Sequence, residues 1–173
     1  MTDEERLNLL LQQLQGETSN CGGQYHFTKI ELPSGSSIVD KLKSYLRQYE
    51  KYKHPYFFSE SQKKEIYVTD RDPENLVLKL VDDFEFILEE KLNYWSNHKT
   101  SLDIREQVTE LYKPLESQFK LNLTCFLDKI GLVNIYLLSG VDTHYCFGQD
   151  HVNDDILIEG NESYFILHFG WSS

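Results

Sequence analysis

The hydrophobic residues of this chain change their spacing near Leu121, and this change constrains the fold more than any other feature. Before Leu121 they recur every three or four residues, which is typical of amphipathic helices. From Leu121 onward, apolar and polar residues alternate in short runs separated by turn residues, as in antiparallel strands. The sequence therefore predicts an α+β fold, in which a helical N-terminal two-thirds packs on a C-terminal antiparallel β-meander.

Helical spacing first occurs at 7–14, where leucines stand at i, i+3, i+4 and i+7 and Gly16 follows as a stop. The alternating segment 25–32 predicts a first strand. After the break at 33–36, a second helix is expected to begin near Ser37 and to end before Pro55, with its apolar residues along one side.

Two more helices are expected in the middle of the chain. Asp72-Pro73-Glu74 predicts the start of the longest one, since Asp can cap free N–H groups and Pro is tolerated at the first helical position. Its apolar stripe continues to Trp95, so this helix is expected to be central in the core. A further helix at 104–115 is expected to be disturbed at its end by Pro114.

The expected strands are short. Segments 121–127 and 132–138 predict a hairpin, with Lys129-Ile130-Gly131 as its turn. A third strand is expected near 143–147, and 156–158 with 164–169 predicts a final hairpin. The segments 56–58 and 65–69 are also compatible with short strands or with irregular structure.

The length of 173 residues suits one domain, 1–173, which can bury a sizeable core without disulfides or metals. Its 28 acidic residues outnumber the 17 Lys and Arg residues and give a net charge of -11. That charge repels phosphate backbones and anionic lipids, and no basic patch offsets it, so neither nucleic acid nor a membrane is expected as a partner.

Three widely spaced cysteines and an acidic N-terminus without a signal sequence predict a protein of the reducing cytoplasm. No apolar run is long enough to span a membrane.

Several residues invite a chemical interpretation. His144, Cys146, Asp150 and His151 are metal-ligand types, but their spacing matches no standard site. Cys21 with His26 could form a thiol–imidazole pair, although no flanking motif supports it. The segment 150–155 is rich in oxygen ligands yet lacks the order of a calcium loop. The favoured interpretations are a core position for Cys146, a flexible turn at Cys21 and a solvated loop at 150–155. No cofactor, metal or catalytic residue is therefore predicted.

The strongest functional signal is charge. The last Lys or Arg is Lys129, and the 44 residues after it contain six acids. The sequence predicts a C-terminal rim of uncompensated negative potential, which would attract a basic protein. Trp171 joins this rim as a candidate interface anchor. The predicted partner-binding residues are Asp142, Asp150, Asp154, Asp155, Glu159 and Trp171.

The leading hypothesis is a small cytoplasmic inhibitor of a basic protein, most concretely an immunity protein that neutralises a toxin such as a nuclease. One alternative is a small enzyme that uses His and Cys residues of the C-terminal sheet. The other is a structural or regulatory protein whose helices pack against a second copy to form a homodimer.

Overall fold

The computed structural model describes residues 1–15, 22–49, 73–98, 105–141, 143, 146–147 and 152–172. In residues 22–23, 96–98, 105–109, 111, 152 and 171–172 it describes the backbone alone. The segments 56–58 and 65–69 lie outside the described residues.

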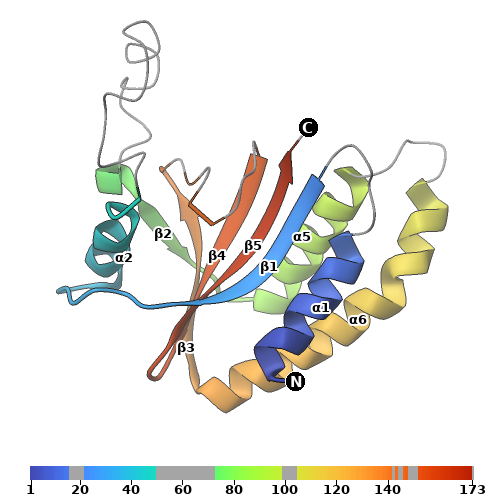
Figure 1. Cartoon of the computed structure of the whole chain (residues 1–173), viewed down its shortest axis with the longest axis horizontal. Coiled ribbons are helices and arrows are strands. Elements are labelled where there is room, and N and C mark those ends of the chain that lie inside the picture. The colour runs from blue at the N-terminus through green and yellow to red at the C-terminus, as the bar shows by residue number, and fades with distance from the viewer. Residues whose placement is uncertain are drawn as a thin grey trace, which may run out of the picture.

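The described strands form one antiparallel sheet, in the order β1-β5-β4-β3-β2 (Figure 1). They are β1 (Gly22–Ile30), β2 (Val77–Leu80), β3 (Leu132–Ser139), β4 (Val152–Gly160) and β5 (Tyr164–Ser172). β4 and β5 join through the two-residue loop Asn161-Glu162, closed by a bond of 2.8 Å from the Gly160 N–H to the Ser163 carbonyl. The mixed α+β class and the meander of β3, β4 and β5 are therefore confirmed.

Three helices cover one side of the sheet, which we call the helical face: α1 (Asp3–Gln15), α5 (Phe84–His98) and α6 (Arg105–Ile130). Figure 1 shows them on the side of the sheet opposite to α2 (Ile38–Leu46). The core between helices and sheet contains all four leucines predicted in α1, and Trp95 of α5 is 1% exposed. The buried strand residues of this core are Tyr25, Phe27, Ile135, Ile156, Ile158, Phe165, Leu167 and Phe169.

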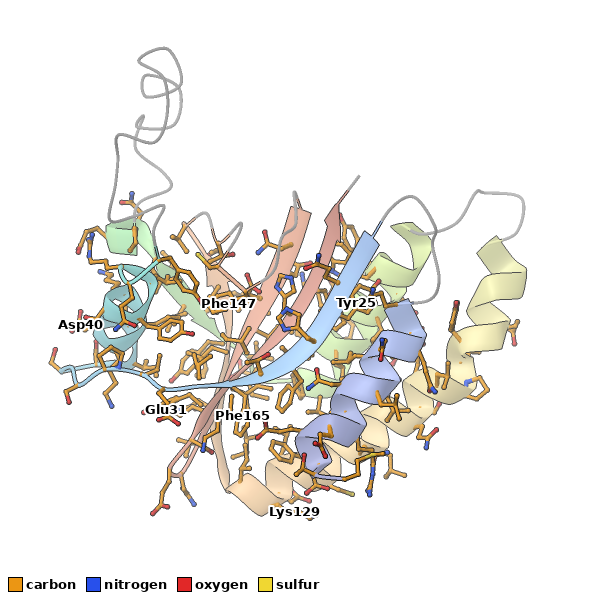
Figure 2. All side chains as sticks on the ribbon, viewed as in Figure 1. Tyr25, Glu31, Asp40, Lys129, Phe147 and Phe165 are labelled. Carbon is orange, nitrogen blue, oxygen red and sulfur yellow. The ribbon has the colours of Figure 1, made fainter. Side chains whose placement is uncertain are left out.

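The other side of the sheet, the α2 face, has a second core. Ser37 caps α2 by accepting a hydrogen bond from the Asp40 N–H, and Leu42 and Leu46 are both fully buried. Phe147 packs in this cluster, and Figure 2 shows it between the sheet and α2. Helices thus cover both faces of the sheet, which explains why β5 is apolar on both sides.

The sheet also recruits strands from the N-terminal half at both edges. One of them, β2, corrects the prediction of a long helix from 73 to 95. Pro73–Asn75 forms one 3-10 turn, and Val77–Leu80 is a strand that pairs with β3. The helix begins only at Phe84, because Asp83 caps it by accepting a hydrogen bond from the Phe86 N–H at 3.1 Å.

The helix α6 corrects two further predictions. It runs unbroken from Arg105 to Ile130, through Pro114 and through the segment predicted as a strand at 121–127. The alternation that suggested a strand is misleading, since Leu121 is 65% exposed. The buried residues follow helical spacing, and they are Phe119, Leu123, Phe126 and Leu127.

Gly131 then adopts a φ of 63°, which ends α6 and leads directly into β3. The predicted hairpin at 121–138 is thus a helix, a turn and a strand. The third predicted strand, near 143–147, is also wrong in its described part, because the Cys146 N–H bonds to the Thr143 carbonyl in a turn.

Candidate functional site

A buried carboxylate–imidazole pair lies on the α2 face of the sheet. Asp155 of β4 and His168 of β5 are direct neighbours across the two strands. His168 Nδ1 lies 2.6 Å from Asp155 Oδ1, and both side chains are 1% exposed. Because alternate residues of a strand face the same side, this pair continues the row of Leu157 and Ile166 beyond the α2 core.

The second oxygen of the same carboxylate accepts two more hydrogen bonds. Thr143 donates its hydroxyl to Asp155 Oδ2 at 2.6 Å, and Asn153 donates its amide to that atom at 2.6 Å. The Asn153 amide also contacts the Thr143 hydroxyl at 2.7 Å. Both oxygens of Asp155 therefore have partners, as a buried carboxylate requires.

Aromatic and polar side chains surround this cluster. The ring of His26 stacks on that of His168 with centroids 4.6 Å apart, and His26 Nδ1 lies 3.2 Å from the Thr28 hydroxyl. Burial raises the pKa of Tyr49, and its hydrogen bond with Tyr45 and the nearby Cys146 and Asp155 raise it further.

A carboxylate that bonds one ring nitrogen of a histidine can orient the imidazole for proton transfer. In this structure, however, the imidazole and its carboxylate lie in the interior, and the described groups that satisfy Asp155 come from the protein itself. The arrangement is typical of a buried network that fixes how β4, β5 and the Thr143 turn fit together.

The structure changes the position expected for Asp155. The sequence predicted this residue at an exposed acidic rim, whereas its side chain points into the α2 face and is buried. The physical reason is the hairpin register, which places Asp155 opposite His168 and on the same face as Leu157. Asp155 itself has no surface available for a partner in this conformation.

Two other described acids of the predicted rim, Asp154 and Glu159, have cationic or polar partners. Asp154 faces the helices, where it accepts a hydrogen bond from the Trp95 indole at 2.9 Å and forms an ion pair with Lys91 at 3.1 Å. Glu159 accepts from the Tyr136 hydroxyl at 3.3 Å. The sequence predicted that the negative charges of the rim have no positive charge beside them. This prediction is wrong for Asp154, because Lys91 of α5, which lies outside the C-terminal segment, pairs with it.

The remaining candidates lie mainly outside the described residues, namely Cys21, Asp142, His144, Asp150 and His151. The backbone of Trp171 pairs with Gly23 of β1 and Val152 of β4, and its side chain is not among those described. Cys146 is 8% exposed and packs in the α2 core, as the core interpretation predicted.

A run of exposed apolar and acidic residues follows the chain from β2 into α5, and sequence analysis did not single it out. We call it the β2–α5 surface. Its apolar residues are Val77, Leu80 and Phe86, which are 55%, 50% and 64% exposed. Its acidic residues, all exposed, are Asp82, Asp83, Glu85, Glu89 and Glu90. The exposed Lys79 is the cation of β2.

Most of these carboxylates are not neutralised by neighbours. Within the part of the chain that the structure describes, Glu89 is the one that forms an ion pair, with Lys120 at 3.8 Å. Asp83 accepts the capping hydrogen bond from Phe86, and Asp82 and Glu85 flank the positive end of the α5 dipole. The sequence clue was Phe86, an aromatic residue between acids, but the predicted long helix made this segment look like an ordinary solvated face.

Comparison with known proteins gives no relative: no family model, no curated protein and no solved structure matches the chain. Among the described residues, no helix combines the length and apolar character needed to cross a bilayer. The same residues contain no group of three His, Cys, Asp or Glu side chains placed to hold a metal ion.

Proposed function

We propose that this protein binds a basic protein and inhibits it, as an immunity protein does with a toxin. The observation that carries the proposal is the β2–α5 surface, where Phe86 is 64% exposed among five exposed carboxylates. An exposed aromatic side chain surrounded by charge has the composition of an interface centre with a polar rim.

Electrostatics supports the choice of partner. The chain has a net charge of -11, so its field attracts cations from every direction and speeds their encounter. Proteins that act on nucleic acids carry basic sites, and an acidic protein competes with the polyanion for such a site or covers it from one side. Inhibition then follows from occupancy and needs no catalytic group.

The C-terminal acids have a revised part in this proposal. Asp142, Asp150, Asp154, Glu159 and Trp171 stay predicted contact residues. Asp155 is assigned to the interior network between β4 and β5, the strands on which Asp154, Glu159 and Trp171 lie.

The first experiment is affinity capture from the native host lysate at low and moderate salt, followed by mass spectrometry. A triple variant, Asp82→Asn with Glu85→Gln and Glu90→Gln, removes three charges from the β2–α5 surface. A matched variant, Glu31→Gln with Glu110→Gln and Glu162→Gln, removes the same charge from exposed positions elsewhere.

We expect a stoichiometric basic protein whose binding weakens as salt rises, because salt screens the attraction. The surface variant should bind that protein about tenfold more weakly, whereas the matched variant should bind nearly as the wild type does. The captured protein should lose its own activity when wild-type protein is added. Recovery of the bait alone, or a captured protein that stays active in the complex, would contradict the proposal.

A further inference from the structure

The two edge strands of the sheet, β1 and β2, differ in how their outward backbone groups are bonded, and this difference suggests how a partner binds. At the β1 edge, side chains of α1 occupy the outward backbone groups. Asn8 accepts the Phe27 N–H at 2.7 Å and donates to the Phe27 carbonyl at 2.8 Å. Gln15 accepts the Tyr25 N–H at 3.1 Å. The fold thus closes this edge with amide side chains that imitate a neighbouring strand.

The β2 edge has no such cover among the described residues. β2 is the last strand in the sheet order, and its one described neighbour is β3 (Figure 1). Val77 and Leu80, the first and last residues of β2, are about half exposed. Such an edge is a ready template for another strand.

The hydrogen-bond pattern between β2 and β3 identifies which backbone groups of β2 do not point toward β3. The Val81 N–H bonds to the Ile135 carbonyl at 2.9 Å, so residue 81 is of the type that exchanges bonds with β3. In an antiparallel pair this type alternates, which places Val77 and Lys79 in the same class. The N–H and C=O groups of Leu78 and Leu80 consequently point away from β3, to the side where the described residues place no further strand.

The charges near β2 indicate which kind of strand would bind at this edge. The chain runs from Leu80 directly into the acids of the β2–α5 surface, which begin at Asp82. A strand that added to β2 would therefore lie beside several exposed carboxylates and one cation, Lys79. Phe86 is exposed in the first turn of α5 and can pack against an apolar side chain of the added strand.

We propose that β2 accepts an extended basic segment of the partner protein as an additional strand of the sheet. The inference rests on the proposed function, because it names the binding mode of the same surface. Main-chain bonds to Leu78 and Leu80 hold the segment, and the acids after Leu80 select lysine and arginine in it. The edge at β1 cannot serve in this way, since α1 already occupies it.

The test uses the full chain and three synthetic peptides of about eight residues, the length of an ordinary strand. The first alternates lysine with valine, the second alternates glutamate with valine, and the third is the lysine peptide with alternate backbone amides methylated. Amide hydrogen exchange by NMR reports on Leu78 and Leu80. We expect the first peptide alone to slow their exchange, by about tenfold at saturation.

Two variants distinguish the contribution of the Leu80 backbone N–H to peptide binding from that of the Leu80 side chain. Leu80→Pro removes an outward N–H but leaves the bond from Val81 to Ile135 intact, since proline is tolerated at a free edge. Leu80→Ala keeps the N–H and removes the exposed side chain. We expect the proline variant to lose the lysine peptide and the alanine variant to retain most of its affinity. If the proline variant does not fold, the methylated peptide gives the same comparison on the wild type.

Failure of the lysine peptide to bind, or binding without protection of Leu78 and Leu80, would overturn strand addition. These results are distinguishable from failure of the proposed function. If a basic protein captured from the host binds the wild type and the proline variant equally well, the edge is excluded while inhibition of a basic partner stands. Equal binding of the glutamate peptide would also contradict the inference, because it would remove the role of charge.

Discussion

At the scale of single residues, the carboxylate of Asp155 links three polar groups on the α2 face of the sheet. His168, Thr143 and Asn153 all direct a polar atom at it, within 2.6 Å in each case. We expect Asp155→Ala to lower the free energy of unfolding by about 3 kcal/mol, because it removes three hydrogen bonds, one of them to the buried imidazole of His168, from a largely buried network. Urea unfolding monitored by tryptophan fluorescence measures the change.

The neighbouring residue provides the control. Asp154→Ala also removes two contacts, to Trp95 and Lys91, but its side chain is 31% exposed and water can replace what is lost. Its cost should be about 1 kcal/mol. A loss at Asp155 no larger than the loss at Asp154 would show that the buried network does not stabilise the sheet.

The Asp155–His168 pair could have been found from sequence by counting back from the turn. The final hairpin was predicted correctly, and its two-residue loop pairs Gly160 with Ser163. Extending that register by five residues on each strand reaches Asp155 and His168. The interpretation of 150–155 as a solvated loop ends the predicted strand too early to include Asp155. Thr143 could not be added in any case, since its contact depends on tertiary structure.

At the scale of secondary-structure elements, two glycines with positive φ end α6 and β3. Gly140 (φ 75°) lies so close to the chain before β2 that a Cβ there would be 2.2 Å from the Asn75 carbonyl oxygen. Gly131 (φ 63°) would instead bring a Cβ to 2.2 Å from the side-chain amide of Asn161, which is exposed and can move.

Alanine at the two positions should therefore have unequal effects. Gly131→Ala should cost about 1 kcal/mol, which is the usual penalty of a left-handed backbone for a residue with a Cβ. Gly140→Ala should cost about 3 kcal/mol, because the backbone of Asn75 must also shift and β2 with it. Thermal unfolding measures both, and hydrogen exchange should show faster exchange in β2 for the second variant. Equal losses of stability would mean that the backbone of residues 73–76 can shift at little cost in free energy.

The elements also show where hydrophobic spacing is a reliable guide and where it is not. In α1 the four leucines fit one helical face and no other pattern, so 7–14 was predicted correctly. In α6, Leu121, Leu123 and Leu127 fit an alternating pattern as well as a helical one, and Phe126 decides between them only if it is known to be buried. β2 is too short to show a period, and it is held in place by pairing with β3, which local sequence does not reveal.

At the scale of the whole molecule, the excess of acids acts on stability as well as on binding. A net charge of -11 on one folded chain means that carboxylates repel one another across its surface. Some of this repulsion is relieved locally, as where Lys129 bonds Asp3 at 2.9 Å and lowers the pKa of that carboxyl. Exposed pairs of this kind contribute little to stability, so the repulsion should dominate.

Added salt should then stabilise the protein at neutral pH. The unfolding temperature at pH 7 should rise by several degrees between about 20 mM and 300 mM sodium chloride, because the screening length falls to below about 10 Å. Near pH 4.9, where the net charge is close to zero, the same salt should have almost no effect. The unfolding temperature of the triple variant of the β2–α5 surface should rise less with salt than that of the wild type, since part of the repulsion is gone.

A fall in unfolding temperature with salt at pH 7 would instead mean that attraction within pairs such as Asp3 with Lys129 outweighs repulsion between the acids. In that case repulsion among the exposed carboxylates of α5 would not destabilise the free protein. A basic partner would then gain no affinity by neutralising them.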